Sequence, residues 1–210
     1  MDAAGQPVLP THEMLNAFAA TLGTYPAFSN WFQLEEIREG PLSGQPVLLV
    51  ARWLCHLSGL RHITVELFLD PPGWPGVTLV QVRGVNKIES PADFDMPCAG
   101  HVDGLDGIYA SLAKELEEEL GLRIDDLEDL REVKRFDAPS DSGPEPRNHE
   151  FRVLYQARLK AASTRHIRLR EGEVAGLAVI TLPELRLLVE RFPERVASGL
   201  LEALPLYQAT

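Results

Sequence analysis

The sequence predicts a mixed α+β protein in which helices pack on the faces of a mixed sheet. Apolar, strand-like runs come in groups, an amphipathic helical segment separates two of these groups, and helical stretches follow the last strand. The elements do not alternate regularly enough for a Rossmann fold or a barrel. The 210 residues, 45% of them apolar, suit one domain with or without an extension.

Residues 1–44 are predicted to form an N-terminal extension. Positions 13–22 carry apolar residues at helical spacing, and residues 24–44 mix aromatic residues with turn formers. We expect this extension to pack on the main domain, with a cap over the substrate or a dimer contact as the alternative. The main domain is predicted over residues 45–210.

Strands are expected where apolar and β-branched residues cluster between turn formers. These segments are residues 46–56, 61–70, 77–83, 131–136, 151–159 and 175–180, with a short apolar stretch at 94–98. Residues 61–70 and 77–83 could form a hairpin, and the proline-rich residues 137–148 are expected to be a surface loop. Helices are expected over 107–120, from the capping box Thr181–Glu184 onward, and over 194–204.

Charge and cysteine content limit the function classes. A net charge of −11 argues against a nucleic-acid or anionic-membrane partner, because both require a basic surface. It does not argue against phosphate substrates, since a divalent metal reverses the local charge. Cys55 and Cys98 match no zinc-binding spacing, and no apolar run is long enough to span a bilayer. We therefore expect a soluble, cytoplasmic protein with reduced thiols.

The helical segment 107–120 carries the most informative pattern. Glu115, Glu118 and Glu119 stand at i, i+3 and i+4, so they project from one side of the helix, and leucines occupy the opposite side. Carboxylate oxygens are the ligands that Mg²⁺ or Mn²⁺ prefers. From the glutamates alone, a solvated acidic face is the alternative.

The spacing of residues 100–122 resembles the Nudix box. Glycines, glutamates and aliphatic residues stand at the positions of that motif, with Asp106 and Lys114 as same-charge substitutions for glutamate and arginine; the matching residues are Gly100, Glu115, Leu116, Glu118, Glu119, Gly121 and Leu122. Residues 59–62, 83–87 and 94–102 further resemble the branch related to isopentenyl-diphosphate isomerase. The resemblance covers about residues 56–192. It implies an α/β/α sandwich with a mixed central sheet and a loop–helix–loop motif.

The resemblance also implies roles for the residues of the box. Glu118 and Glu119 would bind Mg²⁺, or Mn²⁺ in its place, together with the backbone carbonyl of Gly100. Glu115 would be a further ligand or the base that acts on water. Lys114 would take the place of the arginine that orients the catalytic glutamate, without the planar fork of a guanidinium.

Residues outside the box complete the predicted site. Glu171 and Glu173, on one glycine-containing turn, are the candidates for a catalytic base outside the box, with an ordinary charged turn as the alternative, and Glu150 is a weaker candidate. Arg83, Lys87 and His101 are the candidates for substrate binding. His101 could instead bind a metal, as the corresponding histidine does in the isomerase, or support its loop. His56 and His62 could supply further nitrogen ligands.

The resemblance implies metal-dependent hydrolysis of a diphosphate linkage in a nucleoside diphosphate derivative or a related compound, with a homodimer as the possible assembly. One alternative is isomerisation of isopentenyl diphosphate. It is disfavoured because Ala99 stands where the isomerase has its cysteine, and Cys98 should face the other way in an extended segment. The other alternative is a non-catalytic Nudix domain that binds a nucleotide or a protein partner.

Overall fold

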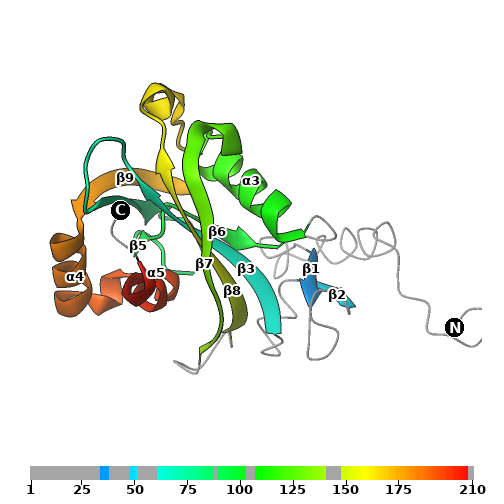
Figure 1. Cartoon of the computed structure of the whole chain (residues 1–210). Helices are drawn as coiled ribbons and strands as arrows, with labels where there is room; N and C mark the ends of the chain where they lie inside the picture. Colours follow the sequence, from blue (N-terminus) through cyan, green and yellow to red (C-terminus); the bar gives the residue numbers. More distant parts are fainter. Residues whose placement is uncertain are drawn as a thin grey trace, which may run out of the picture. The chain divides into compact units, whose positions relative to one another are not determined.

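The computed structural model describes residues 34–37, 48–51, 61–87, 89–102, 107–140 and 148–207 (Figure 1). The chain divides into two compact parts. One comprises Met1–Ile63, His101–Gly107 and Asp137–Phe151, and the other comprises Thr64–Gly100, Ile108–Phe136 and Arg152–Thr210. The predicted helix at 13–22, His56 and Asp106 lie outside the described residues.

The described strands form three sheets. A two-stranded antiparallel sheet pairs β1 with β2, a four-stranded sheet has the order β6-β3-β8-β7, and a three-stranded sheet has the order β5-β4-β9. The strands are β1 (Leu34–Ile37), β2 (Leu48–Ala51), β3 (Arg61–Asp70), β4 (Val77–Arg83), β5 (Phe94–Asp95), β6 (Cys98–His101), β7 (Leu127–Ser140), β8 (Asn148–Leu159) and β9 (Val174–Thr181). The predicted α+β class with a mixed sheet is confirmed.

Strands β3 and β4 begin and end at the predicted residues, but the predicted hairpin between them is wrong. Strand β3 lies between β6 and β8, so both of its hydrogen-bonding edges are already occupied. Strand β4 instead pairs antiparallel with β9, and with β5 on its other edge. The turn at residues 71–76 therefore carries the chain from one sheet to another.

Strands β7 and β8 are longer than predicted. They extend into residues 137–140 and 148, which the sequence assigned to a surface loop. Side-chain contacts hold this extension. Arg61 Nε donates to Asp137 Oδ1 at 2.5 Å, and the Arg61 guanidinium lies 4.1 Å from the centre of the Phe151 ring.

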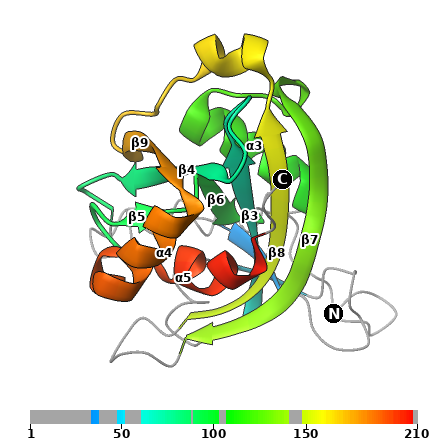
Figure 2. The same cartoon turned by 60° about the vertical axis from the view of Figure 1, so that its left-hand side comes forward.

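The described helices are α3 (Gly107–Leu120), α4 (Leu182–Arg191) and α5 (Ser198–Ala203). The capping box at the start of α4 is confirmed, because Glu184 N donates to Thr181 Oγ1 and Thr181 N donates to Glu184 Oε2. The predicted helix over 194–204 is shorter, with 3₁₀ turns on both sides of α5. Helices α4 and α5 lie side by side in both views (Figures 1 and 2). Among the described helices, none combines the length and apolar character that a membrane crossing requires.

The hydrophobic core of the larger part joins its strands to these C-terminal helices. Phe68 and Val80 come from β3 and β4, Leu185 from α4 and Leu200 from α5. The T-shaped contact between Phe68 and Tyr207, with ring centroids 5.0 Å apart, adds the last described residue to this core. The chain after β9 is thereby fixed against the sheets.

Candidate active site

Helix α3 is anchored by its leucine side and bounded by glycines. Leu112, Leu116 and Leu120 are completely buried. Gly107 has a φ of +74° and Gly121 a φ of +67°, a region that favours glycine because it has no Cβ. A Cβ on Gly121 would also lie 2.9 Å from the Cβ of Arg168. The helix therefore ends at the glycine that the sequence indicates.

The three glutamates of α3 have different surroundings. Glu119 is 6% exposed and Glu115 is half-buried, whereas Glu118 is exposed. The Glu118 carboxylate lies 3.1 Å from Nη1 of Arg170. The structure brings Glu115 and Glu119 against β6, whereas Glu118 pairs with the segment that leads into β9.

Gly100 gives the Glu115 carboxylate its space. A Cβ at position 100 would lie 2.2 Å from Cδ and 2.4 Å from Oε1 of Glu115. Both distances are far below van der Waals contact, so any larger residue would displace this carboxylate. The backbone of β6 and an α3 carboxylate thus meet at a glycine.

Glu119 is a buried carboxylate held by hydrogen bonds. Its Oε2 accepts from the backbone N–H of Ala99 at 3.1 Å and from Nε2 of Gln81 at 3.4 Å. Burial, and then the negative charge of Glu115, raise the pKa of Glu119 to about 8. The buried Glu119 and the half-buried Glu115 offer carboxylate oxygens, the donor type that suits Mg²⁺ or Mn²⁺, so these residues fit the expected ion.

Arg83 is occupied by protein acceptors at the end of β4. Its Nη1 donates to Asp95 Oδ2 at 2.6 Å, and its Nε and Nη2 donate to the carbonyl of Glu89 at 3.2 and 3.1 Å. The pKa of Asp95 is raised by burial, an effect that the charge of Arg83 partly offsets. Asp95 Oδ1 also accepts from Met96 N. Arg83 thus ties β4 to the segment that leads into β6.

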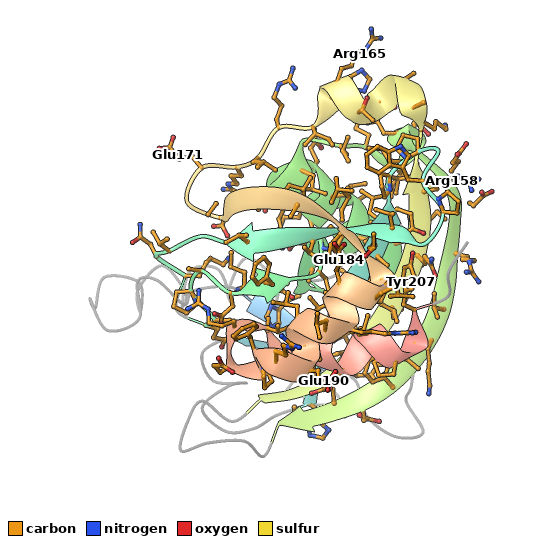
Figure 3. All side chains as sticks on the ribbon, turned by 90° about the vertical axis from the view of Figure 1, so that its left-hand side faces the viewer. Arg158, Arg165, Glu171, Glu184, Glu190 and Tyr207 are labelled. Atoms are coloured by element: carbon orange, nitrogen blue, oxygen red, sulfur yellow. The ribbon has the colours of Figure 1, made fainter. Side chains whose placement is uncertain are left out.

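Lys87 and Glu173 form an ion pair between the end of β4 and the turn before β9. The hydrogen bond from Lys87 lowers the pKa of Glu173 below its usual value. Glu171, the other candidate on this turn, points away from the ribbon into solvent (Figure 3). Of the two candidate bases on the turn, only Glu173 contacts another predicted site residue, which is Lys87.

His101 lies in a cluster with His62 and Glu150. The two imidazole rings are stacked, with centroids 5.1 Å apart, and His101 Nε2 lies 4.0 Å from Glu150 Oε1. All three side chains are buried, and their potential ligand atoms lie within 4.8 Å of one another. Two imidazoles and a carboxylate could hold a transition metal, since Zn²⁺ and similar ions accept nitrogen and oxygen ligands.

Cys98 is completely buried, whereas the neighbouring Ala99 is partly exposed. Burial raises the pKa of the Cys98 thiol well above its usual value, and the charges of Glu119 and Glu115 act in the same direction. A thiolate is therefore disfavoured at this position. The expected orientation of Cys98 away from the isomerase position stays a prediction.

Some residues of this site were missed from the sequence. Gln81 and Asp95 are single polar residues within apolar segments, which is the signal that could have identified them. Arg170 carries no such signal, because it lies in a charged turn. Lys114 is half-buried on α3, and its orienting role stays a prediction.

Comparisons with known proteins match this chain to one family model and to several solved structures. The model of the NUDIX domain matches residues 61–201. The structure of DR0079 from Deinococcus radiodurans is similar with a TM-score of 0.63 at 20% identity, over 83% of this chain and 99% of that chain. A MutT NUDIX hydrolase from Burkholderia pseudomallei has a TM-score of 0.52 at 19% identity, over 70% and 98% of the two chains.

A further solved structure contains a ligand. The NUDIX domain of Shewanella oneidensis NrtR, complexed with ADP ribose, has a TM-score of 0.52 at 12% identity, over 70% of this chain and 85% of that chain. No match was found among curated proteins. At these identities the solved structures show the fold, and the match over residues 61–201 shows the family.

Proposed function

The chain belongs to the NUDIX family, and we propose that it hydrolyses a diphosphate linkage with a divalent metal, Mg²⁺ or Mn²⁺, held by the carboxylates of α3. The substrate class proposed is a nucleoside diphosphate derivative or a related diphosphate. The burial of the Glu119 carboxylate beside Glu115 carries this proposal. Two carboxylates are costly to bury together, and a bound cation removes that cost.

The carboxylates of α3 are proposed to differ in their tasks. Glu115 and Glu119, with the Gly100 carbonyl, would form the core of the metal site. Glu118 would join them by leaving Arg170, an exchange that costs little because that ion pair is exposed. The ion would neutralise phosphate charge and activate the attacking water.

Other groups of the chain would position the substrate and the ligands. The N–H of Ala99 and the amide of Gln81 hold the Glu119 carboxylate in one orientation. The positive charge of Lys87 partly offsets the rise in the pKa of Glu119. Glu173 is proposed as the base outside the box. The resting pair with Lys87 keeps it ionised, which is the form that accepts a proton.

Two observations support the substrate class. The first is membership in the NUDIX family, because one structural neighbour with this domain is a MutT NUDIX hydrolase. The second is that the NUDIX domain of a structural neighbour was solved with ADP ribose, a nucleoside diphosphate derivative. The base and sugar are set by residues outside α3, so the substrate must be found by a screen.

The experiment is metal-dependent turnover of a diphosphate panel by the full chain. Nucleotide sugars, dinucleotides, nucleoside di- and triphosphates and prenyl diphosphates are incubated with Mg²⁺ or Mn²⁺, and released monophosphate is measured. Glu119→Gln should lose activity by roughly a hundredfold or more, because a ligand to the ion is lost. Glu117→Gln, exposed on the same helix, is the matched control and should keep full activity.

Two outcomes would contradict the proposal. Full activity in Glu119→Gln would remove this residue from the mechanism. Ligand-induced thermal stabilisation without turnover of any panel member would indicate a binding domain in place of an enzyme.

Isomerisation of a prenyl diphosphate is less well supported. It would require a reactive thiol at position 99, where this chain has alanine, and the Cys98 thiol is buried with a raised pKa. We therefore propose hydrolysis, and the panel should yield no rearranged allylic product.

A second metal position is proposed at His62, His101 and Glu150. Ligands of one tetrahedral ion lie roughly 3.4 Å apart when each bond is about 2.1 Å. The three potential ligand atoms lie within 4.8 Å, so small rotations of the side chains would bring them to one ion. Metal content of the purified full chain tests this position, with loss of one equivalent in His62→Gln as the expected result.

A further inference from the structure

The end of β4 and the turn before β9 create a cationic environment around one carboxylate. Lys87 contacts Glu173 directly, and the charges of Arg170 and Arg83 further stabilise its ionised form. The protein as a whole carries a net charge of −11, so a local group of cations stands out against it. These cations favour an anion beside Lys87, and in this structure that anion is the carboxylate of Glu173.

The backbone of Glu173 is fixed. Its carbonyl accepts from the N–H of Gly84 at 2.8 Å. A Cβ on Gly84 would lie 2.0 Å from the carbonyl oxygen of Gly172, and Gly172 has a φ of +85°. The turn is therefore packed directly on the end of β4, at a contact that requires glycine. The side chain of Glu173 remains 37% exposed, so solvent reaches the carboxylate that Lys87 contacts.

Two of the candidates for substrate binding, Arg83 and Lys87, differ in how firmly they are held. The Arg83 side chain is 16% exposed and its partner Asp95 only 6%, and three Arg83 donors already have protein acceptors. Separating them would leave a buried charge without its partner, which is strongly unfavourable. Lys87 is 29% exposed and forms a pair of the weak, solvent-screened kind. An incoming phosphate can replace Glu173 far more easily than Asp95.

The site of the Glu173 carboxylate is also electrostatically linked to α3. The positive charge of Lys87 lowers the pKa of Glu119. Arg170 N donates to the carbonyl of Glu119 at 3.3 Å, and its guanidinium pairs with Glu118. A phosphate bound to Lys87 would thus lie in the electrostatic field of the same carboxylates that are proposed to hold the ion.

We propose that Glu173 is a resident anion that occupies, before substrate binds, the position that a phosphoryl group takes against Lys87. Substrate binding then proceeds by exchange of one anion for the other at Lys87, while Arg83 stays locked to Asp95 and positions β5. This inference rests on the proposed function for the identity of the anion as part of a diphosphate. The exchange itself requires no hydrolysis.

The test uses inorganic diphosphate as the probe and the full chain in EDTA, so that binding is measured without turnover. Calorimetric titration at low ionic strength should give about two- to fivefold tighter binding in Glu173→Gln, because the competing carboxylate is removed. Lys87→Gln should weaken binding to a similar or larger extent. The double variant should lack the gain, since the gain requires the freed lysine.

Glu171→Gln is the matched control. It removes the same charge two residues away on the same turn, from a side chain that points into solvent (Figure 3). Equal or weaker binding in Glu173→Gln would overturn the proposal. An equal gain in Glu171→Gln would also overturn it, because a general charge effect would then account for the result.

Kinetics separate this inference from the proposed hydrolysis. With a substrate from the panel, removal of the competing anion lowers KM, whereas loss of a catalytic base lowers kcat. A lower KM in Glu173→Gln with any change in kcat supports the exchange, and an unchanged or higher KM contradicts it. A protein that binds diphosphate as described but turns over no substrate would contradict the proposed hydrolysis and leave the exchange intact.

Discussion

The carboxylates of α3 and the cluster of His62, His101 and Glu150 both bring polar side chains together, yet they differ in burial, in donors and in assembly. The α3 site offers oxygen ligands and lies within one continuous segment that begins at Gly100. The histidine cluster offers two nitrogens and one oxygen, taken from β3, β6 and β8. The first suits a hard ion such as Mg²⁺, and the second suits a transition metal.

The difference teaches that the charges of the neighbouring groups decide what burial does to a carboxylate. At Glu119, two like charges are brought together, and the pKa rises because the charged form is disfavoured. In the histidine cluster, a carboxylate lies beside imidazoles that can carry the opposite charge. In the metal-free protein a proton on Glu119 relieves the repulsion at the first group, whereas the second can balance its charge by protonation of an imidazole.

After the loss expected for Glu119→Gln, the next largest effect should come from Gly100→Ala. The new Cβ would lie 2.2 Å from Cδ of Glu115, so this flexible side chain must move while the backbone stays in place. Hydrolysis with Mg²⁺ should fall by about a hundredfold, since displacement of a ligand by about 1 Å has effects of this size. Urea unfolding in EDTA should change by less than about 1 kcal/mol, because a side-chain end gives way at little cost.

The contrast between activity and stability makes this prediction specific. A large loss of stability would mean that Gly100 serves the fold and not the site. Full activity in Gly100→Ala would show that the position of Glu115 beside β6 has no part in hydrolysis.

The second prediction concerns the pH dependence of the metal-free protein. Glu119 has a pKa of about 8 in the folded protein against an ordinary value of 4.5, so the folded state holds this proton more tightly than the unfolded state. Its contribution to stability is full below pH 4.5 and is lost as the pH rises toward 8. The free energy of unfolding in EDTA should fall by on the order of 2 kcal/mol over this range because of Glu119.

Glu119→Gln and Glu117→Gln isolate this contribution. The difference in unfolding free energy between Glu119→Gln and the unchanged protein should grow with pH, whereas Glu117→Gln should follow the unchanged protein. Parallel curves for all three proteins would mean that Glu119 is ionised in both states, contrary to its buried surroundings.

The same comparison shows how much the sequence could predict. The α3 site follows from local spacing, because residues three and four apart on a helix face the same side and the flanking glycines mark the strand end and the helix end. Helix 107–120 was therefore predicted with the bounds that the structure has. Strands 61–70 and 77–83 were also predicted with their observed bounds, because turn formers mark their ends. Burial of Glu119 and exposure of Glu118 were not predictable, since they depend on β6 and on Arg170.

Sheet partners and long-range groupings were beyond the sequence for a different reason. The wrong hairpin between β3 and β4 came from adjacency along the chain, whereas pairing depends on which strand edges are free. His62 was considered as a further nitrogen ligand beside His101, but Glu150 was considered only as a base, because no local pattern joins residues that lie so far apart. The Lys87–Glu173 pair likewise links β4 to a turn far along the chain.

The smallest expected effect on hydrolysis separates the two roles considered for His101. If His62, His101 and Glu150 hold a metal of their own, His62→Gln and His101→Gln should both lose one equivalent of Zn²⁺ or Mn²⁺ by elemental analysis. Hydrolysis supported by Mg²⁺ at the α3 carboxylates should change by less than about threefold in His62→Gln, because its oxygen ligands are unaltered.

If His101 binds substrate, as the sequence suggested, KM should rise in His101→Gln and not in His62→Gln. Equal loss of Mg²⁺-dependent activity in His62→Gln and Glu119→Gln would mean that the two groups act as one site, and the contrast between them would fail.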